Sequence, residues 1–457
     1  MHCSTNRFYY DILKKMRKKA VTAMAQTDKK IKWKYAAGIF FVLLLYAFAV
    51  VNRFSLPQID GIAYSFHLLD FSLGFCSRFL PGAIYHLFIK DPSQVSAAVY
   101  ETALLVVFFI PLSYMLAAFF ERVPQHYKPA ALTLLALYLT GSCTFAPYSI
   151  SLGMLDVYWI YFSLIYIAVL PRKVLRWLLC PALLFLCTMI HYGVIITYVP
   201  FLCLLTLYEA AAEPQKKEKI KKIILLALCV AVSVGGFTYF LTHDKQNINC
   251  SIAEFHRMLE ENGVGANSLY YDAAFFATPE NYTDEFVELV VGPQGYNGSP
   301  YTPVFEGESL SGVQQLINGL AYQVQYQFFL FTNREIYKDV LIEAGVLLLL
   351  LLPLLVMFYR FAKRGFRDAK GNGLLRLTWF CLFFLFPLAA FVSLVISTDS
   401  VRWTAHGFLC LFTFTLYVLR REPDKWETLR DYLYSFSPVL RAAYFWIYAL
   451  LILDPYV

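Results

Sequence analysis

The sequence predicts an all-α integral membrane protein with about ten or eleven transmembrane helices, and three observations support this prediction. Of the 457 residues, 59% are hydrophobic and only 16% are charged, whereas a soluble protein averages about 45–50% apolar and about 25% charged residues. The apolar residues gather in runs close to the roughly 20 residues that a helix needs to cross a hydrocarbon core of about 30 Å. The connections between these runs alternate between rich and poor in lysine and arginine.

Ten apolar runs predict transmembrane helices, and they divide the chain into two membrane bundles. The N-terminal bundle covers residues 35–241 and the C-terminal bundle covers 340–457. A short eleventh run, 442–453, falls below the lower limit of about 17 residues and can lie partly in the interface. The ten predicted spans are 35–51, 97–120, 130–145, 152–170, 174–190, 194–208, 223–241, 340–359, 377–396 and 403–419.

The basic connections orient the predicted spans. Residues 1–34 form a tail rich in lysine and arginine. Every second connection after it is also basic, namely those that contain 122–128, 172–176, 216–222, 360–370 and 420–425. Because cytoplasmic loops carry the excess of Lys and Arg, the N-terminus is predicted to be cytoplasmic. The net charge of +7 then reflects topology, and we expect no nucleic-acid partner.

Two of the predicted outer segments are long. The first, 52–96, is rich in aromatic and apolar side chains, and its stretch 62–88 predicts one or two short interfacial helices at the membrane surface. The second, 242–339, is acidic and contains two helix-like pieces, separated by turns rich in Asn, Gly and Pro. We therefore expect a small folded cap over the outer end.

Ionisable side chains gather at the outer ends of the predicted spans, where each is a functional candidate because its burial is costly. Asp60, Asp70 and Arg78 belong to the first outer segment. Asp156 lies one turn inside its span, and His191 lies at the junction of two spans. The alternatives are loop solvation or helix capping for the two aspartates of the outer segment and a structural role for the histidine.

Three further candidates follow the last outer turn. Asp399, Arg402 and His406 are spaced i, i+3 and i+7, so a continuous helix places them on one face. They form either an ion pair at a helix end or an anion-binding cluster directed at a phosphate. No nucleotide-binding or metal-binding motif occurs in the sequence, and we expect neither a cofactor nor a metal.

This layout resembles that of the bacterial membrane enzymes that build surface polysaccharides from polyprenyl-linked sugars, the Wzy-type polymerases and the wider GT-C glycosyltransferases. The shared features are about eleven spans, a cytoplasmic N-terminus, an acidic first outer loop with interfacial helices and a large late outer loop. The segment Asp60-Gly61-Ile62-Ala63-Tyr64 is similar to the Asp-Glu-x-x-Tyr start of the first outer loop in GT-C enzymes, although Gly61 replaces the second acid. The turn 399–402 is similar to the one that carries a late outer arginine in contact with lipid phosphate.

The resemblance implies a glycosyltransferase or polysaccharide polymerase that acts on polyprenyl-phosphate-linked sugars at the outer face of a bacterial cytoplasmic membrane. The implied catalytic bases are Asp60, Asp70 and Asp156, and the implied substrate-binding residues are Arg78, His191, Asp399, Arg402 and His406. Two alternatives stay open. A transporter or flippase for lipid-linked glycans would use the same cavity without making a bond, and a membrane assembly protein would use the acidic cap to bind a partner. The sequence leaves the oligomeric state open.

The predicted topology can be tested with reporter fusions. A reporter fused after Glu306 should be external, and one fused after Lys370 should be cytoplasmic, because the intervening span reverses the side of the membrane. Reporter activity in intact cells measures this directly. Exchange of the two signals would contradict the orientation and the outer position of the candidate residues.

Overall fold

The computed structural model describes residues 32–54, 58–59, 61–141, 144–150, 152–243, 334–382 and 400–451, together with scattered residues between 247 and 321. Over these residues the chain folds into helices joined by turns, without a β-strand. Four of the described helices are long and apolar enough to cross a membrane: Lys32–Val51, Gln94–Glu121, Val194–Ala211 and Lys216–Phe240. The predicted all-α class is therefore confirmed, whereas the number of spans and their orientation stay predictions.

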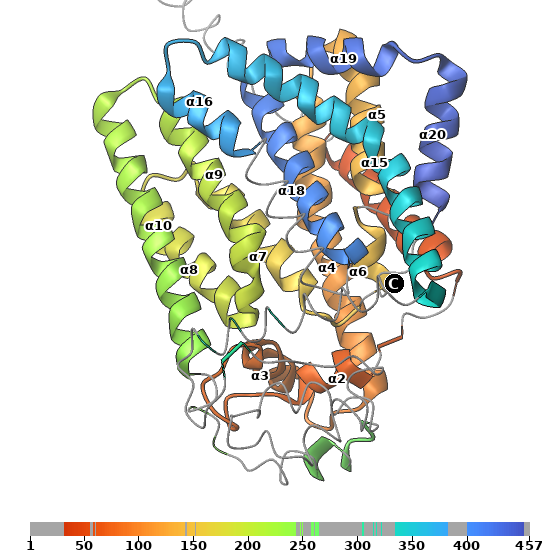
Figure 1. Ribbon diagram of the computed structural model, residues 1–457, viewed down its shortest axis with the longest axis vertical. Helices are drawn as coiled ribbons and strands as arrows, with labels where there is room; N and C mark the ends of the chain where they lie inside the picture. The colour runs from red at the N-terminus through yellow and green to blue at the C-terminus, as the bar shows by residue number, and fades with distance from the viewer. Residues whose placement is uncertain are drawn as a thin grey trace, which may run out of the picture.

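The N-terminal bundle consists of helices that run up and down beside one another (Figure 1). Its main members are α4 (Gln94–Glu121), α5 (Lys128–Leu139), α7 (Asp156–Val169), α8 (Leu175–Ile190), α9 (Tyr198–Ala211) and α10 (Lys216–His243). Helix α4 begins with a capping box. The Ser93 hydroxyl accepts a hydrogen bond from the backbone N–H of Ser96, and the Ser96 hydroxyl accepts one from the backbone N–H of Ser93. Helix α10 packs against both α8 and α9, and together they form one side of the bundle.

Two helices are shorter than the spans predicted for them. The predicted span 130–145 ends as a helix at Leu139, and a separate short helix α6 (Ala146–Ile150) follows. The ring of Tyr448 lies where a side chain on Gly141 would be, only 2.0 Å from the ideal Cβ position. The predicted span 152–170 begins as helix α7 at Asp156, because Leu155 before it adopts a left-handed conformation with φ of 68°.

The first outer segment contains two short helices, α2 (Gly61–Leu68) and α3 (Phe79–Phe88), as its sequence predicts. They lie together at one end of the bundle, which we call the α2–α3 end (Figure 1). A Cβ on Gly82 would lie 1.8 Å from the carbonyl oxygen of Leu69, so only glycine permits this approach. The backbone of Asn249 donates a hydrogen bond of 2.8 Å to Leu73, so the second outer segment begins against the first. Most of the predicted cap, 242–339, lies outside the described residues.

The C-terminal bundle contains α15 (Arg334–Asp368), α16 (Gly373–Phe380), α18 (Ser400–Arg421), α19 (Trp426–Tyr434) and α20 (Pro438–Leu450). Helix α19 lies across the end of the bundle opposite α2 and α3 (Figure 1). It buries Trp426, Leu429 and Leu433, which share one face of the helix because they are three, four and seven residues apart.

A network of buried charges ties α9, α10 and α18 together at this second end, which we call the basic end because its connections carry the lysines and arginines. The Glu209 carboxylate is almost fully buried. It accepts hydrogen bonds from Lys222 at 3.1 Å and from the Tyr417 hydroxyl at 2.5 Å, and it lies 2.5 Å from Arg421. The hydrogen bond from Lys222 also lowers the pKa of Glu213. A buried carboxylate is tolerated when several donors satisfy it, and here the donors join both bundles.

The packing of α15 against α16 can be tested at a position where the two helices are in close contact. A Cβ on Gly365 would lie 2.3 Å from the ring of Trp379, whereas one on Gly373 would meet nothing within 4 Å. Gly365→Ala should destabilise the protein by about 1–3 kcal/mol, because overpacking forces the buried ring to move. Thermal unfolding in detergent measures the effect. Gly373→Ala is the matched control and should leave the melting temperature unchanged or higher, and equal behaviour of the two variants would contradict this packing.

Candidate functional site

Four of the residues selected from the sequence come together at the α2–α3 end. They form two pairs, Asp156 with His406 and Arg78 with His191, although the members of each pair are far apart in the chain. The indole ring of Trp159 contacts both histidines. We call these five residues the Trp159 cluster.

The first pair joins the start of α7 to α18. His406 Nε2 lies 3.3 Å from Asp156 Oδ1, and the side chains are 0% and 2% exposed. Asp156 occupies the first turn of α7, where the positive end of the helix dipole stabilises a carboxylate. Carboxylate and imidazole groups are common general acids and bases, so this pair is a candidate for proton transfer.

Aromatic rings enclose the imidazole of His406. Tyr148 stacks on it with ring centroids 5.5 Å apart, and Tyr198 approaches from another direction at 5.3 Å. The hydroxyl groups of these two tyrosines are hydrogen-bonded to each other at 2.7 Å. The edge of Trp159 completes the enclosure with a centroid distance of 5.4 Å. The pair is therefore held in one geometry within a water-poor environment, where electrostatic interactions are stronger than in water.

The second pair joins the start of α3 to the end of α8. The Arg78 guanidinium donates a hydrogen bond of 2.7 Å from Nη2 to Nε2 of His191. Since Nε2 accepts, the proton of a neutral His191 imidazole is on Nδ1. Arg78 itself is left-handed, with φ of 69°, and its backbone donates to Met189 at 2.7 Å. Both side chains are half-buried, so this pair is the more accessible part of the cluster.

Trp159 connects the two pairs into one site. Its ring meets His191 edge-on with a centroid distance of 6.0 Å and His406 at 5.4 Å. It is three residues after Asp156, nearly one helical turn further along α7, and it is buried. The indole thus contacts two imidazoles, one paired with a guanidinium and the other with a carboxylate, and this combination can bind an anion and move a proton.

The remaining candidates do not join this cluster in the part of the chain that the structure describes. Asp70 accepts hydrogen bonds from the backbone and hydroxyl of Ser72, and it lies 3.8 Å from His86. The contacts with Ser72 lie within the loop between α2 and α3 and fit the loop alternative for Asp70. Asp60 and Asp399 lie outside the described residues. Arg402 is in the first turn of α18, four residues before His406 on the same helix, and its side chain also lies outside the described part.

The structure also shows a buried pair that sequence reasoning missed. His67 Nε2 lies 2.8 Å from Glu101 Oε1, with exposures of 0% and 1%. His67 Nδ1 donates to the Ala63 carbonyl at 2.8 Å, so the contact between Nε2 and the carboxyl group must contain a further proton. The pair therefore shares one ionisable proton. Glu101 inside a predicted span was the available signal, because a buried carboxyl group requires a partner.

The described residues contain no group of three or more His, Cys, Asp or Glu side chains arranged to hold a metal ion. Fold and site together define an all-helical protein with apolar helices compatible with a membrane and with a polar, ionisable cluster at one end. No protein-family model, curated protein or solved structure matches the chain.

The buried pair of His67 and Glu101 predicts a strong effect on stability. Glu101→Ala should lower the free energy of unfolding by about 3–5 kcal/mol, because it leaves a buried polar partner unsatisfied. Thermal or denaturant unfolding in detergent measures the loss. The control is Glu121→Ala in the same helix, whose ion pair with Lys32 at 3.1 Å is partly exposed and should contribute about 1 kcal/mol or less. Similar losses in both variants would contradict a special role for the buried pair.

Proposed function

We propose that this protein is a membrane glycosyltransferase or polysaccharide polymerase that uses a polyprenyl-phosphate-linked sugar at the α2–α3 end of the bundle. The observation that carries the proposal is the Trp159 cluster, in which one indole contacts the histidine of a guanidinium–imidazole pair and the histidine of a carboxylate–imidazole pair. Sugar transfer from a lipid phosphate needs a cation for the leaving group and a base for the acceptor hydroxyl.

Arg78 and His191 are assigned to the phosphate. Both are half-buried, so an anionic group at the membrane surface can approach them. The guanidinium of Arg78 keeps its charge at all physiological pH values and presents planar N–H groups that match phosphate oxygens. Its contact with His191 and its stack on Phe66, at 5.9 Å from the ring centroid, restrain its position. A preorganised cation of this kind stabilises the charge that develops on the leaving phosphate.

The pair of Asp156 and His406 is assigned to the proton. In the transfer, the acceptor hydroxyl oxygen forms a bond to the anomeric carbon, and the bond from that carbon to the phosphate oxygen breaks. The phosphate leaves with the bonding electrons, and the hydroxyl proton passes to the base. His406 beside Asp156 suits the base, since the carboxylate can orient the imidazole for proton transfer. Asp60 and Asp70 in the first outer segment remain the alternative bases.

A transporter or flippase for lipid-linked glycans is the second candidate, and the burial of Asp156 and His406 favours it. With exposures of 2% and 0%, this pair serves equally as a fixed link between α7 and α18. Arg78 and His191 would then bind the phosphate during movement of the lipid, without a change in bonding. Substitutions in the cluster would reduce transport, and the unsubstituted protein would form no glycosidic product.

The decisive assay supplies purified protein with a panel of polyprenyl-linked sugars and acceptors and detects a new glycosidic bond by mass spectrometry. Asp156→Asn should reduce the rate by about 10²–10⁴-fold, because the amide cannot support proton transfer. Arg78→Lys should reduce it by about 10²-fold or more, because lysine keeps the charge and loses the planar fork.

Two exposed residues of the same outer segment provide matched controls. Asp91→Asn and Arg53→Gln remove equivalent charges away from the cluster and should leave the rate within about twofold of the starting protein. Absence of product with every donor, combined with uptake of a labelled lipid-linked sugar into proteoliposomes that Arg78→Lys abolishes, would replace the enzyme with the transporter.

A further inference from the structure

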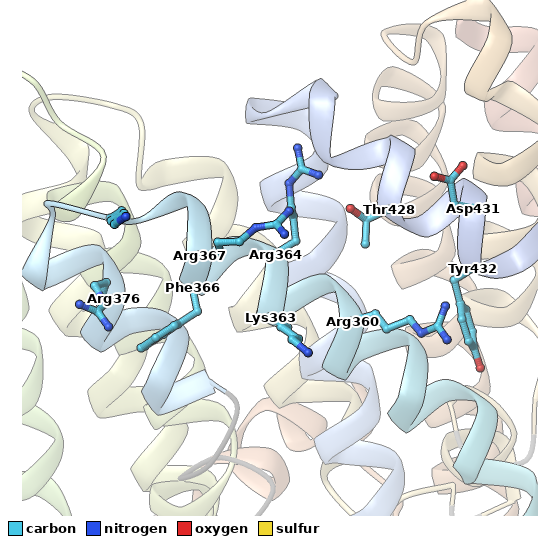
Figure 2. A pocket seen from close by; sticks show the side chains of 10 residues that line it. Arg360, Lys363, Arg364, Phe366, Arg367, Arg376, Thr428, Asp431 and Tyr432 are labelled. Carbon is cyan, nitrogen blue, oxygen red and sulfur yellow. The ribbon is translucent and has the colours of Figure 1, made fainter.

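A strongly basic pocket of about 710 Å³ lies at the basic end, between α15, α16 and α19. Figure 2 shows the lining side chains along the end of α15, on α16 and on α19. Its lining contains one carboxylate, Asp431, and six cations: Arg360, Lys363, Arg364, Arg367, Lys370 and Arg376. The pocket is at the opposite end of the bundle from the Trp159 cluster (Figure 1), so it is a separate site.

The helical repeat of α15 builds this concentration of charge. Arg360, Lys363, Arg364 and Arg367 are spaced i, i+3, i+4 and i+7, and these positions share one face of a helix. The chain then reverses direction between α15 and α16, so that Arg376 of α16 lines the same pocket. Like charges this close repel one another, and an arrangement of this kind is stabilised when an anion binds among them.

Carboxylates in the protein offset only part of the positive charge. Asp368 binds Arg364 at 2.9 Å and also Lys425 at 3.0 Å. Burial would raise the pKa of Asp368, but hydrogen bonds from Lys425 and Arg364 outweigh that effect and lower it, so this carboxylate is ionised and committed to them. Asp431 lies 2.8 Å from its neighbour Arg430. Among the described residues, the other five pocket cations have no ion pair with a carboxylate.

Aromatic rings restrain two of the guanidinium groups. Arg376 stacks on Phe366 with its Cζ 4.5 Å from the ring centroid, and Arg360 lies 5.1 Å from the centroid of Tyr432. The Tyr432 hydroxyl donates a hydrogen bond of 2.8 Å to the Pro353 carbonyl, which fixes that ring. Cation–π contacts hold an arginine without consuming its N–H donors, so these groups stay available to oxygen atoms of a ligand.

Exposed apolar side chains lie beside the pocket and indicate an amphiphilic ligand. Phe366 lines the pocket and is 39% exposed. On α16, Leu377 is 48% exposed directly after Arg376, and Phe380 is 44% exposed one turn further. An acyl chain can cover these side chains while its phosphate meets the cations. Basic pockets between membrane helices on the cytoplasmic side bind lipid head groups by this combination.

We propose that this pocket binds the phosphate group of an anionic membrane lipid. The test uses the full-length protein in a neutral detergent and titrates short-chain phosphatidylglycerol, with phosphatidylcholine as the neutral lipid and inorganic diphosphate as the soluble phosphate. Binding is followed by native mass spectrometry. Phosphatidylglycerol should bind at least tenfold more tightly than phosphatidylcholine, and it should bind even when inorganic diphosphate is present at the same concentration.

The double variant Arg360→Gln/Arg367→Gln should bind phosphatidylglycerol about 25-fold more weakly, since each basic residue near a lipid surface contributes about fivefold. The matched control is Lys216→Gln/Lys217→Gln, which removes two exposed lysines of α10 at the same end and should bind as the starting protein does. Asp431→Asn should bind several times more tightly, because it removes the carboxylate from the lining. A gain of affinity cannot arise from misfolding.

Equal affinity of the starting protein and the arginine double variant would overturn the proposal, and so would an Asp431→Asn variant without any gain. Equal binding of the anionic and neutral lipids would show that the chains alone are recognised. Tight binding of inorganic diphosphate that displaces the lipid would overturn the lipid as ligand and assign the pocket to a soluble phosphate compound. None of these outcomes depends on the function proposed for the Trp159 cluster.

Discussion

An ionisable group inside an apolar helix bundle needs a partner, and this requirement determines how the helices of this protein meet. Burial of an isolated charge costs several kcal/mol even after relaxation. His67 and Glu101 join α2 to α4, and Asp156 joins α7 to His406 of α18. Glu209 joins α9 to α10 and α18. Except for the contact between the consecutive helices α9 and α10, each contact links helices that are not neighbours in the sequence, so the charges help to select which helices pack together.

Helix α18 shows what these contacts achieve together. It is fixed near its start by His406 and at its end by Arg421. These two residues are 15 positions apart, which corresponds to about 22 Å along a helix. The C-terminal bundle is therefore attached to the N-terminal bundle at both ends of one helix. The Trp159 cluster and the basic pocket lie at opposite ends of the bundle (Figure 1), and they can consequently bind different ligands.

Apolar runs and charges near their ends were enough to predict most of the described helices, although not α6 or α19, and four of the five cluster residues. The contacts among them were not predictable. The helix predicted over 130–145 ends at Leu139 near Gly141, which packs against Tyr448. The two residues of that contact are 307 positions apart in the chain, so the sequence near Gly141 gives no signal of it. Similarly, Asp156 and His406 were separate candidates because each is costly to bury, but their pairing depends on which helices become neighbours. Glu101 carried the same signal, and only the fold supplies His67.

The ends of three helices meet at the Trp159 cluster, and their dipoles add to its side chains. Helices α3 and α7 both begin there, directly after Arg78 and Leu155, whose φ angles of 69° and 68° are rare for residues other than glycine. Such strain persists only where the surrounding structure maintains it, often at functional sites. Two helix N-termini direct the positive ends of their dipoles toward the same region. Helix α8 ends one residue before His191, so its negative end lies at the same place and offsets part of this potential. The guanidinium of Arg78 is therefore the main group here that can bind a phosphate in either proposed function.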